Sequence, residues 1–435
     1  MDIWDKLERK KSIIIWIVVY LLSTVLIYLL AISPLFSYAY MTTHINPITF
    51  GICVLLFLIT VHLLPIKTDR PSSYLFYLIY IVAYLPTLLY TWMNNMEVRY
   101  ILYFTFCIII IEVFVSSSHV ICIGIKNAEV FFYGFFVIYV FASFLLVILN
   151  GGINPNSFLI SEISANRNNN VSGFWGYLLN WCAKSFSPIY FAFFYYKRKW
   201  RLVGFVCVIQ ILLYLSFGFK AFLFSIGLLI FMTFILEKGM HYFKLMPELF
   251  SFVHVLSYLL FKTGITQLPL FTFAYRTLFI PAQCQFQYYE FFTNNDFLHF
   301  SEGIIGKIFG VNYPYTYPIG VIVNQYTFGK DYYSNGNTGM FSYGFADFGF
   351  LGMVLASILL VIIFKIVDGS TLNIPKSLVV SAMSYQMIIL NDSNLLISLN
   401  TGGIIFSIFL LIVINSNQII NDKDEDDKVL GLLLE

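Results

Sequence analysis

Long apolar runs separated by short polar connections make up most of the chain. The runs are longer than ordinary strands, and they lack the alternation of apolar and polar residues that marks the strands of a membrane β-barrel. A helix that crosses a bilayer needs about 20 predominantly apolar residues. The pattern therefore predicts an all-α polytopic membrane protein of about twelve spans, built as one domain of residues 1–435. The runs lie at 13–32, 48–64, 74–92, 100–116, 130–149, 171–196, 202–217, 221–236, 249–261, 344–364, 377–390 and 395–414.

The composition supports the membrane assignment. Of the 435 residues, 59% are hydrophobic and 11% are charged, and the mean hydropathy is +0.80. Soluble globular chains carry about 25% charged residues, so the bilayer is the expected solvent. The formal net charge of +2 creates no strong field for a polyanion. A single-span anchored enzyme, a disordered protein and a nucleic-acid binder are excluded, and any charge used for binding must be local.

The basic residues divide unequally when the connections are assigned alternately to the two sides of the membrane. Seventeen fall on the side of the N-terminal cluster at 6–11, seven fall on the other side, and Lys184 lies within a run. Because basic residues accumulate in cytoplasmic connections, both termini and the tail at 415–435 are expected in the cytoplasm. The seven basic residues expected outside are Arg99, Arg167, Lys220, Lys262, Arg276, Lys307 and Lys330.

One long connection, residues 262–343, is expected on the outer face. Long connections in compact proteins are usually functional or disordered, and this one is rich in tyrosine, unlike disordered segments. Tyrosine combines an apolar ring face with a hydroxyl group, which suits the faces and rims of sugars. Tyr288, Tyr289 and Tyr343 are therefore candidate substrate-binding residues, and the alternative for each is an aromatic belt at the membrane interface.

This segment contains short motifs in a fixed order. It opens with YRTLFIPA at 275–282, continues to YYEFF at 288–292 and closes with PIG at 318–320, NGNTGM at 335–340 and YGFADFGFLG at 343–352. These stretches, before a late transmembrane helix, resemble the Wzy-type O-antigen polymerases, also called oligosaccharide repeat-unit polymerases. In that family an Arg, then Pro and paired tyrosines begin the large periplasmic loop, and Asn-Thr-Gly followed by Phe-Gly-x-x-Gly ends it.

The resemblance implies a fold, an activity and a location. The fold would be similar to that of lipid-carrier-dependent GT-C-type glycosyltransferases, in a bacterial inner membrane. The enzyme would transfer a growing glycan from undecaprenyl pyrophosphate to a new repeat unit on its own undecaprenyl pyrophosphate, at the periplasmic face. The resemblance implies no metal or other cofactor, and it implies a functional partnership with a chain-length regulator protein.

A lipid pyrophosphate leaving group needs cations that offset its developing negative charge. Arginine is better suited than lysine to bidentate phosphate contacts. Arg276 matches the loop-opening arginine of the family and is the first candidate. Lys220 stands where the family and its ligase relatives commonly have Gly-x-Arg or Gly-x-Lys, and Arg167 is a third candidate. For both, an ordinary solvated or snorkelling charge is the alternative. Lys184 is a candidate because it lies within an apolar run as an intramembrane charge, and the alternative is a position near the outer boundary of the membrane.

The transfer also needs a group that removes the proton of the acceptor hydroxyl, at least in an inverting mechanism. Asp347, His299 and Glu290 are the catalytic candidates on the outer side. Asp347 lies one helical turn from Tyr343, and the alternative for Asp347 is an acid that stabilises a helix N-terminus. Asn337 is expected either to orient a turn or to donate to a substrate oxygen. In that turn, Gly336 and Gly339 are expected to have positive φ.

Two other functions share part of this pattern. A flippase for lipid-linked oligosaccharides would use charges along an intramembrane path, short connections and detectable repeats, whereas this chain concentrates its polar features in one outer segment. A ligase relative would have the same architecture and transfer the glycan to a different acceptor.

Overall fold

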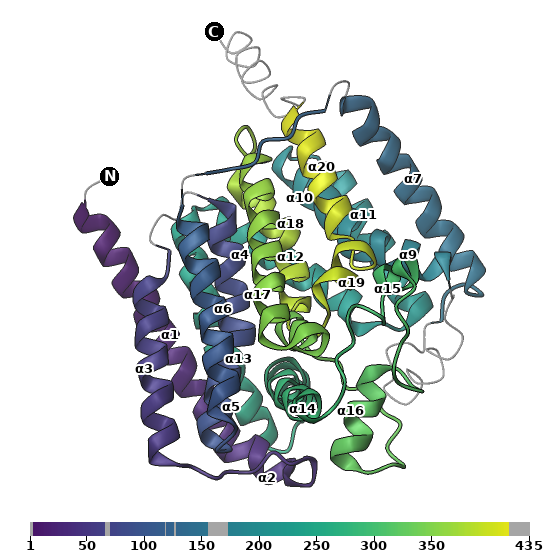
Figure 1. The fold of residues 1–435 in the computed structure, drawn as a ribbon. Helices are drawn as coiled ribbons and strands as arrows, with labels where there is room; N and C mark the ends of the chain where they lie inside the picture. The colour runs from purple at the N-terminus through teal and green to yellow at the C-terminus, as the bar shows by residue number, and fades with distance from the viewer. Residues whose placement is uncertain (1–2, 66–69, 118, 126–127, 155–172, 417–435) are drawn as a thin grey trace.

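The computed structural model describes residues 3–65, 70–117, 119–125, 128–154 and 173–416 (Figure 1). These residues form helices and contain no β-strand, so the all-α prediction is confirmed for this part of the chain. The α-helices are α1 (Ile3–Ile27), α2 (Ser33–Leu35), α3 (Pro47–Leu63), α4 (Pro71–Ile79), α5 (Leu85–Met93), α6 (Val98–Ser116), α7 (Ala128–Leu149), α9 (Phe174–Trp181), α10 (Ser187–Tyr196), α11 (Trp200–Phe217), α12 (Lys220–Glu237), α13 (Leu245–Lys262), α14 (Ile280–Asn294), α15 (Ile304–Phe309), α16 (Ile319–Phe328), α17 (Met340–Gly369), α18 (Lys376–Ile389), α19 (Leu395–Asn400) and α20 (Ile404–Ser416). Two short 3-10 helices are η2 (Ser37–Ala39) and η7 (Met240–Lys244). Four π-helical segments, called π-turns below, are η1 (Tyr28–Ile32), η3 (Tyr80–Tyr84), η6 (Cys182–Phe186) and η8 (Leu270–Phe279).

Within the described ranges, 8 helices are long and apolar enough to cross a membrane. The chain is therefore a polytopic helical membrane protein, while the number of about twelve spans stays a prediction. The predicted run 395–414 forms two helices, α19 and α20, because the chain turns at Gly402 and Gly403, where the φ of Gly403 is +78°. The 8 candidate spans are Lys11–Leu35, Pro71–Met93, Val98–Ser116, Glu129–Leu149, Trp200–Phe217, Lys220–Glu237, Tyr242–Lys262 and Met340–Gly369, and Pro47–Leu63 and Ile404–Ser416 are shorter apolar helices.

Four prolines each follow a π-turn within a continuous helical segment. Pro34, Pro86, Pro188 and Pro281 are the second residues of α2, α5, α10 and α14, which continue directly from η1, η3, η6 and η8. A proline has no N–H, and in an α-helix its ring clashes with the carbonyl four residues earlier. The extra residue of a π-turn widens the helix at that point, which explains how each helix continues through its proline. The carbonyl four residues earlier is then left in need of another donor.

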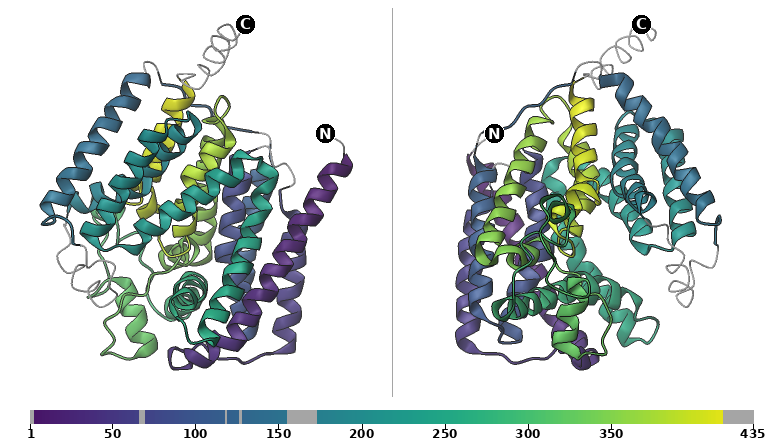
Figure 2. Two further views of the ribbon diagram at one scale, coloured as in Figure 1. Left: turned by 180° about the vertical axis from the view of Figure 1, so that it is seen from behind. Right: turned by 45° about the vertical axis from the view of Figure 1, so that its right-hand side comes forward.

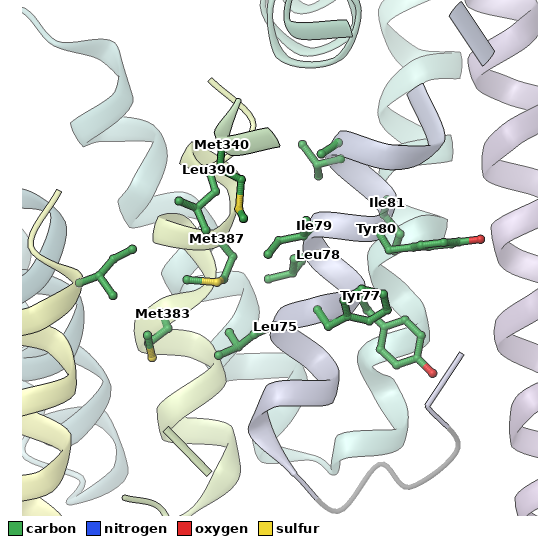
Figure 3. Close-up of a cluster of buried hydrophobic side chains, with 14 of the residues drawn as sticks. Leu75, Tyr77, Leu78, Ile79, Tyr80, Ile81, Met340, Met383, Met387 and Leu390 are labelled. Atoms are coloured by element: carbon green, nitrogen blue, oxygen red, sulfur yellow. The ribbon is translucent and has the colours of Figure 1, made fainter. Parts of the chain in front are cut away.

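The segment formed by α4, η3 and α5 is the most enclosed of the 8 candidate spans among the described residues. All residues from Pro71 to Thr91 are buried, as expected for a helix that is hydrophobic on all sides. Figure 3 shows Leu78 and Ile79 of this segment beside Met387 and Leu390, and Met340 closes one end of the cluster. This packing fixes the end of α18 and the start of α17 against the central helix.

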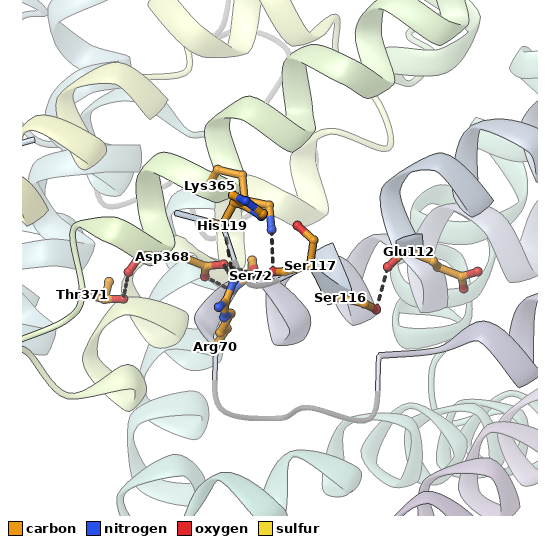
Figure 4. Close-up of polar contacts among 9 residues, drawn as sticks. All are labelled: Arg70, Ser72, Glu112, Ser116, Ser117, His119, Lys365, Asp368 and Thr371. Atoms are coloured by element: carbon orange, nitrogen blue, oxygen red, sulfur yellow. Dashed lines mark hydrogen bonds and ion pairs between the residues drawn. The ribbon is translucent and has the colours of Figure 1, made fainter. Parts of the chain in front are cut away.

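One end of the bundle gathers connections that the charge pattern assigns to the cytoplasm (Figure 4). Arg70 donates to the carbonyl oxygen of Ser117 at 2.6 Å, and Lys365 Nζ donates to the same oxygen at 3.0 Å. The buried Asp368 accepts from the Ser72 N–H at 3.0 Å and from its hydroxyl at 2.7 Å. These contacts join α4, α6 and α17 at their ends. Which end faces the cytoplasm stays a prediction.

The opposite end is covered by the predicted outer segment 262–343, which is largely helical. Figure 1 shows α14 almost along the viewing direction, across the direction of α1, α3 and α6, with α16 beside it. Figure 2 shows from two further sides that α14 and α16 lie at the end of the bundle remote from the start of α1. All of α14 from Pro281 to Phe292 is buried except Glu290. The α14 part of the outer segment is therefore integrated into the protein core.

Candidate functional site

The candidate site lies where three segments that are distant in sequence meet. These are η8, which carries Arg276, η6, which carries Lys184, and the connection 390–394 between α18 and α19. The buried amide of Asn391 joins two of the π-turn segments: its Nδ2 donates to the carbonyl oxygen of Thr277 at 3.0 Å and to that of Val82 at 3.1 Å.

The two carbonyls that Asn391 contacts are those affected by proline. Val82 precedes Pro86 by four residues, and Thr277 precedes Pro281 by four residues. In an ordinary helix these carbonyls would accept from the N–H that proline lacks. Because a buried carbonyl without a donor is costly, Asn391 supplies the missing donor to both helices. One side chain thus ties the connection 390–394 to the residue next to Arg276.

Arg276 is exposed, and among the described residues its guanidinium makes no hydrogen bond or ion pair. Its Cζ lies 5.8 Å from the centre of the Phe271 ring. The preceding residue, Tyr275, is buried and stacks on Phe36 with ring centres 3.8 Å apart. The residues before and after Arg276 are therefore held in place, Tyr275 by Phe36 and Thr277 by Asn391. The guanidinium of Arg276 stays available to a ligand.

Lys184 projects from η6, the π-turn between α9 and α10. The neighbouring contacts hold this turn against the C-terminal helices: the hydroxyls of Ser185 and Ser407 lie 2.7 Å apart, and Trp181 Nε1 donates to the Asn400 carbonyl at 2.7 Å. Lys184 is partly exposed, and no hydrogen bond joins its Nζ to another described residue. It is the second cation of the site.

Asp392 lies within electrostatic range of both cations, Lys184 first and Arg276 second, and of Tyr385 on α18. The residue is accessible to solvent. Desolvation by the surrounding protein nevertheless raises the pKa of its carboxyl to about 6, against the opposing effect of the two cations. A carboxylate and two cations thus share one polar site outside the candidate spans.

Asp347 has a structural partner. Its Oδ1 accepts from the N–H of Phe300 at 2.9 Å, and the carbonyls of Ala346 and Asp347 accept from Leu298 and His299 at 2.8 and 3.2 Å. The helix α17 is interrupted here, since Phe348 and Gly349 have non-helical backbone angles. Asp347 is the last helical residue before this break, and both its role as a base and the alternative role near a helix N-terminus stay predictions. Its carboxylate holds the 298–300 turn against the break in α17.

The three tyrosines expected to bind substrate are buried in the core. Tyr288 is 0% exposed, Tyr289 7% and Tyr343 8%. The Tyr288 hydroxyl donates to the Gly336 carbonyl at 3.1 Å, and its ring centre lies 5.4 Å from that of Tyr343. Burial raises the pKa of Tyr288 well above its usual range. In this conformation the three rings pack against protein, and a contact with sugar stays a prediction. The exposed tyrosines of the segment are Tyr317, Tyr326, Tyr332 and Tyr333.

Electrostatic contacts connect these tyrosines to the cation site through α14. The buried Cys284 is within electrostatic range of Arg276, and it also acts on Tyr288 and Tyr343. The same two tyrosines lie within range of Glu302. Glu302 accepts from the Ile319 N–H at 3.3 Å, and burial raises the pKa of its carboxyl. Arg276, the two tyrosines and Glu302 therefore all lie within electrostatic range of residues on or beside α14.

The turn at 335–339 differs from its prediction. Neither Gly336 nor Gly339 has positive φ. Glycine is needed at both positions because other atoms lie too close for a side chain. A Cβ on Gly336 would lie 2.7 Å from Asn324 Oδ1, and one on Gly339 would lie 2.8 Å from the Asn391 carbonyl oxygen. Asn337 is exposed, and its Oδ1 accepts from Asn335 Nδ2 at 2.8 Å, which orients the turn.

The other candidates lie on the surface. Glu290 is exposed on α14, and the exposed His299 packs against Phe348 with ring centres 5.1 Å apart. Lys220 is exposed at the first position of α12, after Gly218 ends α11 with a φ of +69°. None of these three has a contact with Arg276, Lys184 or Asp392 in the described part of the chain. Arg167 lies outside the described residues.

No family model, curated protein or solved structure matches the chain. Among the described residues, no group of three or more His, Cys, Asp and Glu side chains could hold a metal ion.

Sequence reasoning missed Asp392 and Asn391. The four polar residues at 391–394 interrupt two apolar runs, and that interruption was the available signal. The sequence alone does not distinguish this interruption from a plain connection, because the proximity of residue 392 to residues 184 and 276 arises only in the folded protein.

Proposed function

We propose that the protein is a polymerase of lipid-linked oligosaccharides in a bacterial inner membrane. It would transfer a growing glycan from undecaprenyl pyrophosphate to a lipid-linked repeat unit at the periplasmic face. The observation that carries the proposal is the exposed Arg276, which bonds to no protein acceptor among the described residues and shares a polar site with Lys184 and Asp392. The proposal also rests on the motif order of the outer segment, which resembles the Wzy-type polymerases.

The chemistry of this transfer fits two fixed cations. As the bond between the anomeric carbon and the pyrophosphate oxygen breaks, negative charge grows on the leaving group, and preorganised cations stabilise it in the transition state. The planar guanidinium of Arg276 can contact two phosphate oxygens at once, while the ammonium of Lys184 acts as a point charge. The hydrogen bonds of the neighbouring Thr277 and Ser185 hold η8 and η6 in place and leave the charged groups of Arg276 and Lys184 available to a ligand.

The resemblance supplies the remaining parts of the proposal. The chain-length regulator is the expected functional partner, and Lys220, Arg167, Asn337 and the loop tyrosines stay candidate contacts to the glycan or its carrier. The exposed tyrosines around α16 add surface that suits sugar rings.

Substitution of Arg276 tests the proposal in cells. We expect Arg276→Ala to leave the protein in the membrane and to collapse the long-chain glycan ladder to single repeat units on a gel. Arg276→Lys keeps the charge and loses the planar fork, so intermediate ladders are expected. Lys330→Ala is the control, since Lys330 is also an exposed cation in the set expected outside, and no contact joins its side chain to Arg276, Lys184 or Asp392 among the described residues. A normal ladder from Arg276→Ala would show that the site is assigned wrongly.

A further inference from the structure

The connection 390–394 holds Asp392 in a fixed position. The Met340 N–H donates to the Leu390 carbonyl at 3.0 Å, and the Asn391 amide contacts the carbonyls of Val82 and Thr277. The Asp392 N–H itself donates to the Ile389 carbonyl at 2.9 Å. The backbone that carries the carboxylate is thus tied to α17, to η3 and to η8.

The side chain of Asp392, unlike the backbone around it, is not held by hydrogen bonds to other described residues. It accepts no hydrogen bond from any other described residue, and the residue is exposed. The charged and titratable groups that act on it come from three elements: Lys184 on η6, Arg276 on η8 and Tyr385 on α18. A carboxylate that is held by its backbone, accessible, and without a hydrogen-bond donor from another residue is available to a ligand.

The geometry of glycosyl transfer restricts where a base can lie. In a reactive complex the acceptor oxygen lies about 3–3.5 Å from the anomeric carbon, and the base lies within about 2.6–3.2 Å of that oxygen. The base therefore lies no more than roughly 6–7 Å from the carbon that carries the pyrophosphate. If Arg276 and Lys184 hold the pyrophosphate, the base belongs to their immediate surroundings.

On this basis we propose that Asp392 is the general base that takes the proton of the acceptor hydroxyl. The inference rests on the proposed function. The acceptor oxygen forms the new bond to the anomeric carbon, and the bond from that carbon to the pyrophosphate oxygen breaks. The electron pair leaves with the pyrophosphate beside Arg276 and Lys184, and the hydroxyl proton moves to a carboxylate oxygen of Asp392.

The other carboxylates fit this role less well. Asp347 is 5% exposed and its Oδ1 is occupied by the Phe300 N–H. Glu302 accepts from the Ile319 N–H. Glu290 is exposed, and no contact connects it to the cations in the described structure. The raised pKa of Asp392, about 6, gives further support, because such a carboxylate is ionised at neutral pH and binds a proton more strongly than an ordinary aspartate.

The test uses the purified full-length protein in liposomes with synthetic undecaprenyl-pyrophosphate-linked repeat units. We expect Asp392→Asn to lower kcat by about 10²–10⁴-fold without raising KM, because removal of a negative charge beside two cations does not weaken pyrophosphate binding. Asp331→Asn, the same change at an exposed position of the outer segment, serves as the control and should match the wild type.

Three outcomes separate this inference from the proposed function. Turnover of Asp392→Asn within tenfold of the wild type overturns the inference, and so does a raised KM at unchanged kcat. If the wild type itself does not lengthen the repeat units, the proposed function fails. If Asp392→Asn does not fold, the wild-type pH profile decides: kcat/KM must fall below a pH of about 6, and a flat profile there overturns the inference.

Discussion

Replacement of Asn391 by alanine offers a quantitative test of how the site is built. The change removes Nδ2, which donates to the carbonyls of Thr277 and Val82 at 3.0 and 3.1 Å. A buried polar group that loses its partner costs about 1–3 kcal/mol, so two carbonyls give an upper limit of about 6 kcal/mol. Solvent that reaches the neighbouring Asp392 can hydrate part of the void. We therefore expect a loss of about 2–4 kcal/mol in the free energy of unfolding.

Equilibrium unfolding of the purified variant in mixed micelles measures this loss. Asn294→Ala is the matched control, because the exposed Asn294 also donates from Nδ2 to a carbonyl, that of Glu290 at 3.0 Å, and the carbonyl stays accessible to water. The control should change stability by no more than about 0.5 kcal/mol. Equal stabilities of Asn391→Ala and Asn294→Ala would refute the argument that one amide replaces the donors missing at two prolines.

Three further predictions follow from the same contacts. The acid limb of the wild-type pH profile should be absent from the residual activity of Asp392→Asn, because ionisation of this carboxyl, with a pKa of about 6, enables proton transfer only above that pH; a rate titration from acid to neutral pH checks this. Asp368→Ala should destabilise the protein by about 2–5 kcal/mol, because it removes both hydrogen bonds to Ser72, while the folded fraction keeps its kcat. Gly339→Ala should lower kcat, since its Cβ would lie 2.8 Å from the carbonyl oxygen of Asn391 and displace the connection that carries Asp392; single-turnover rates measure the effect, and an unchanged rate would contradict it.

The helical architecture could be predicted from sequence because membrane-spanning helices produce long apolar runs. The start of α17 at Met340 and the division of the last run at Gly403 could not, since both depend on contacts with distant residues. The π-turns had a local signal in the prolines within apolar runs. Hydropathy alone does not distinguish a kinked helix from one that widens around its proline.

The candidate site was only partly predictable. Arg276 was found from a motif, and Lys184 from its charge within an apolar run. The order of motifs did not reveal that Tyr288 and Asp347 make packing and turn contacts, because burial depends on which helices surround them. Asp392 was missed since its significance comes from two cations that lie more than a hundred residues earlier in the chain.

The central claim is tested most directly by reconstitution. Purified wild-type protein in liposomes, supplied only with undecaprenyl-pyrophosphate-linked repeat units, should convert them into a ladder of longer chains and release undecaprenyl pyrophosphate. The Arg276→Ala variant should be slower by about 10²–10³-fold. If the wild type moves the lipid-linked units across the membrane without lengthening them, or leaves them unchanged, the protein is not a polymerase.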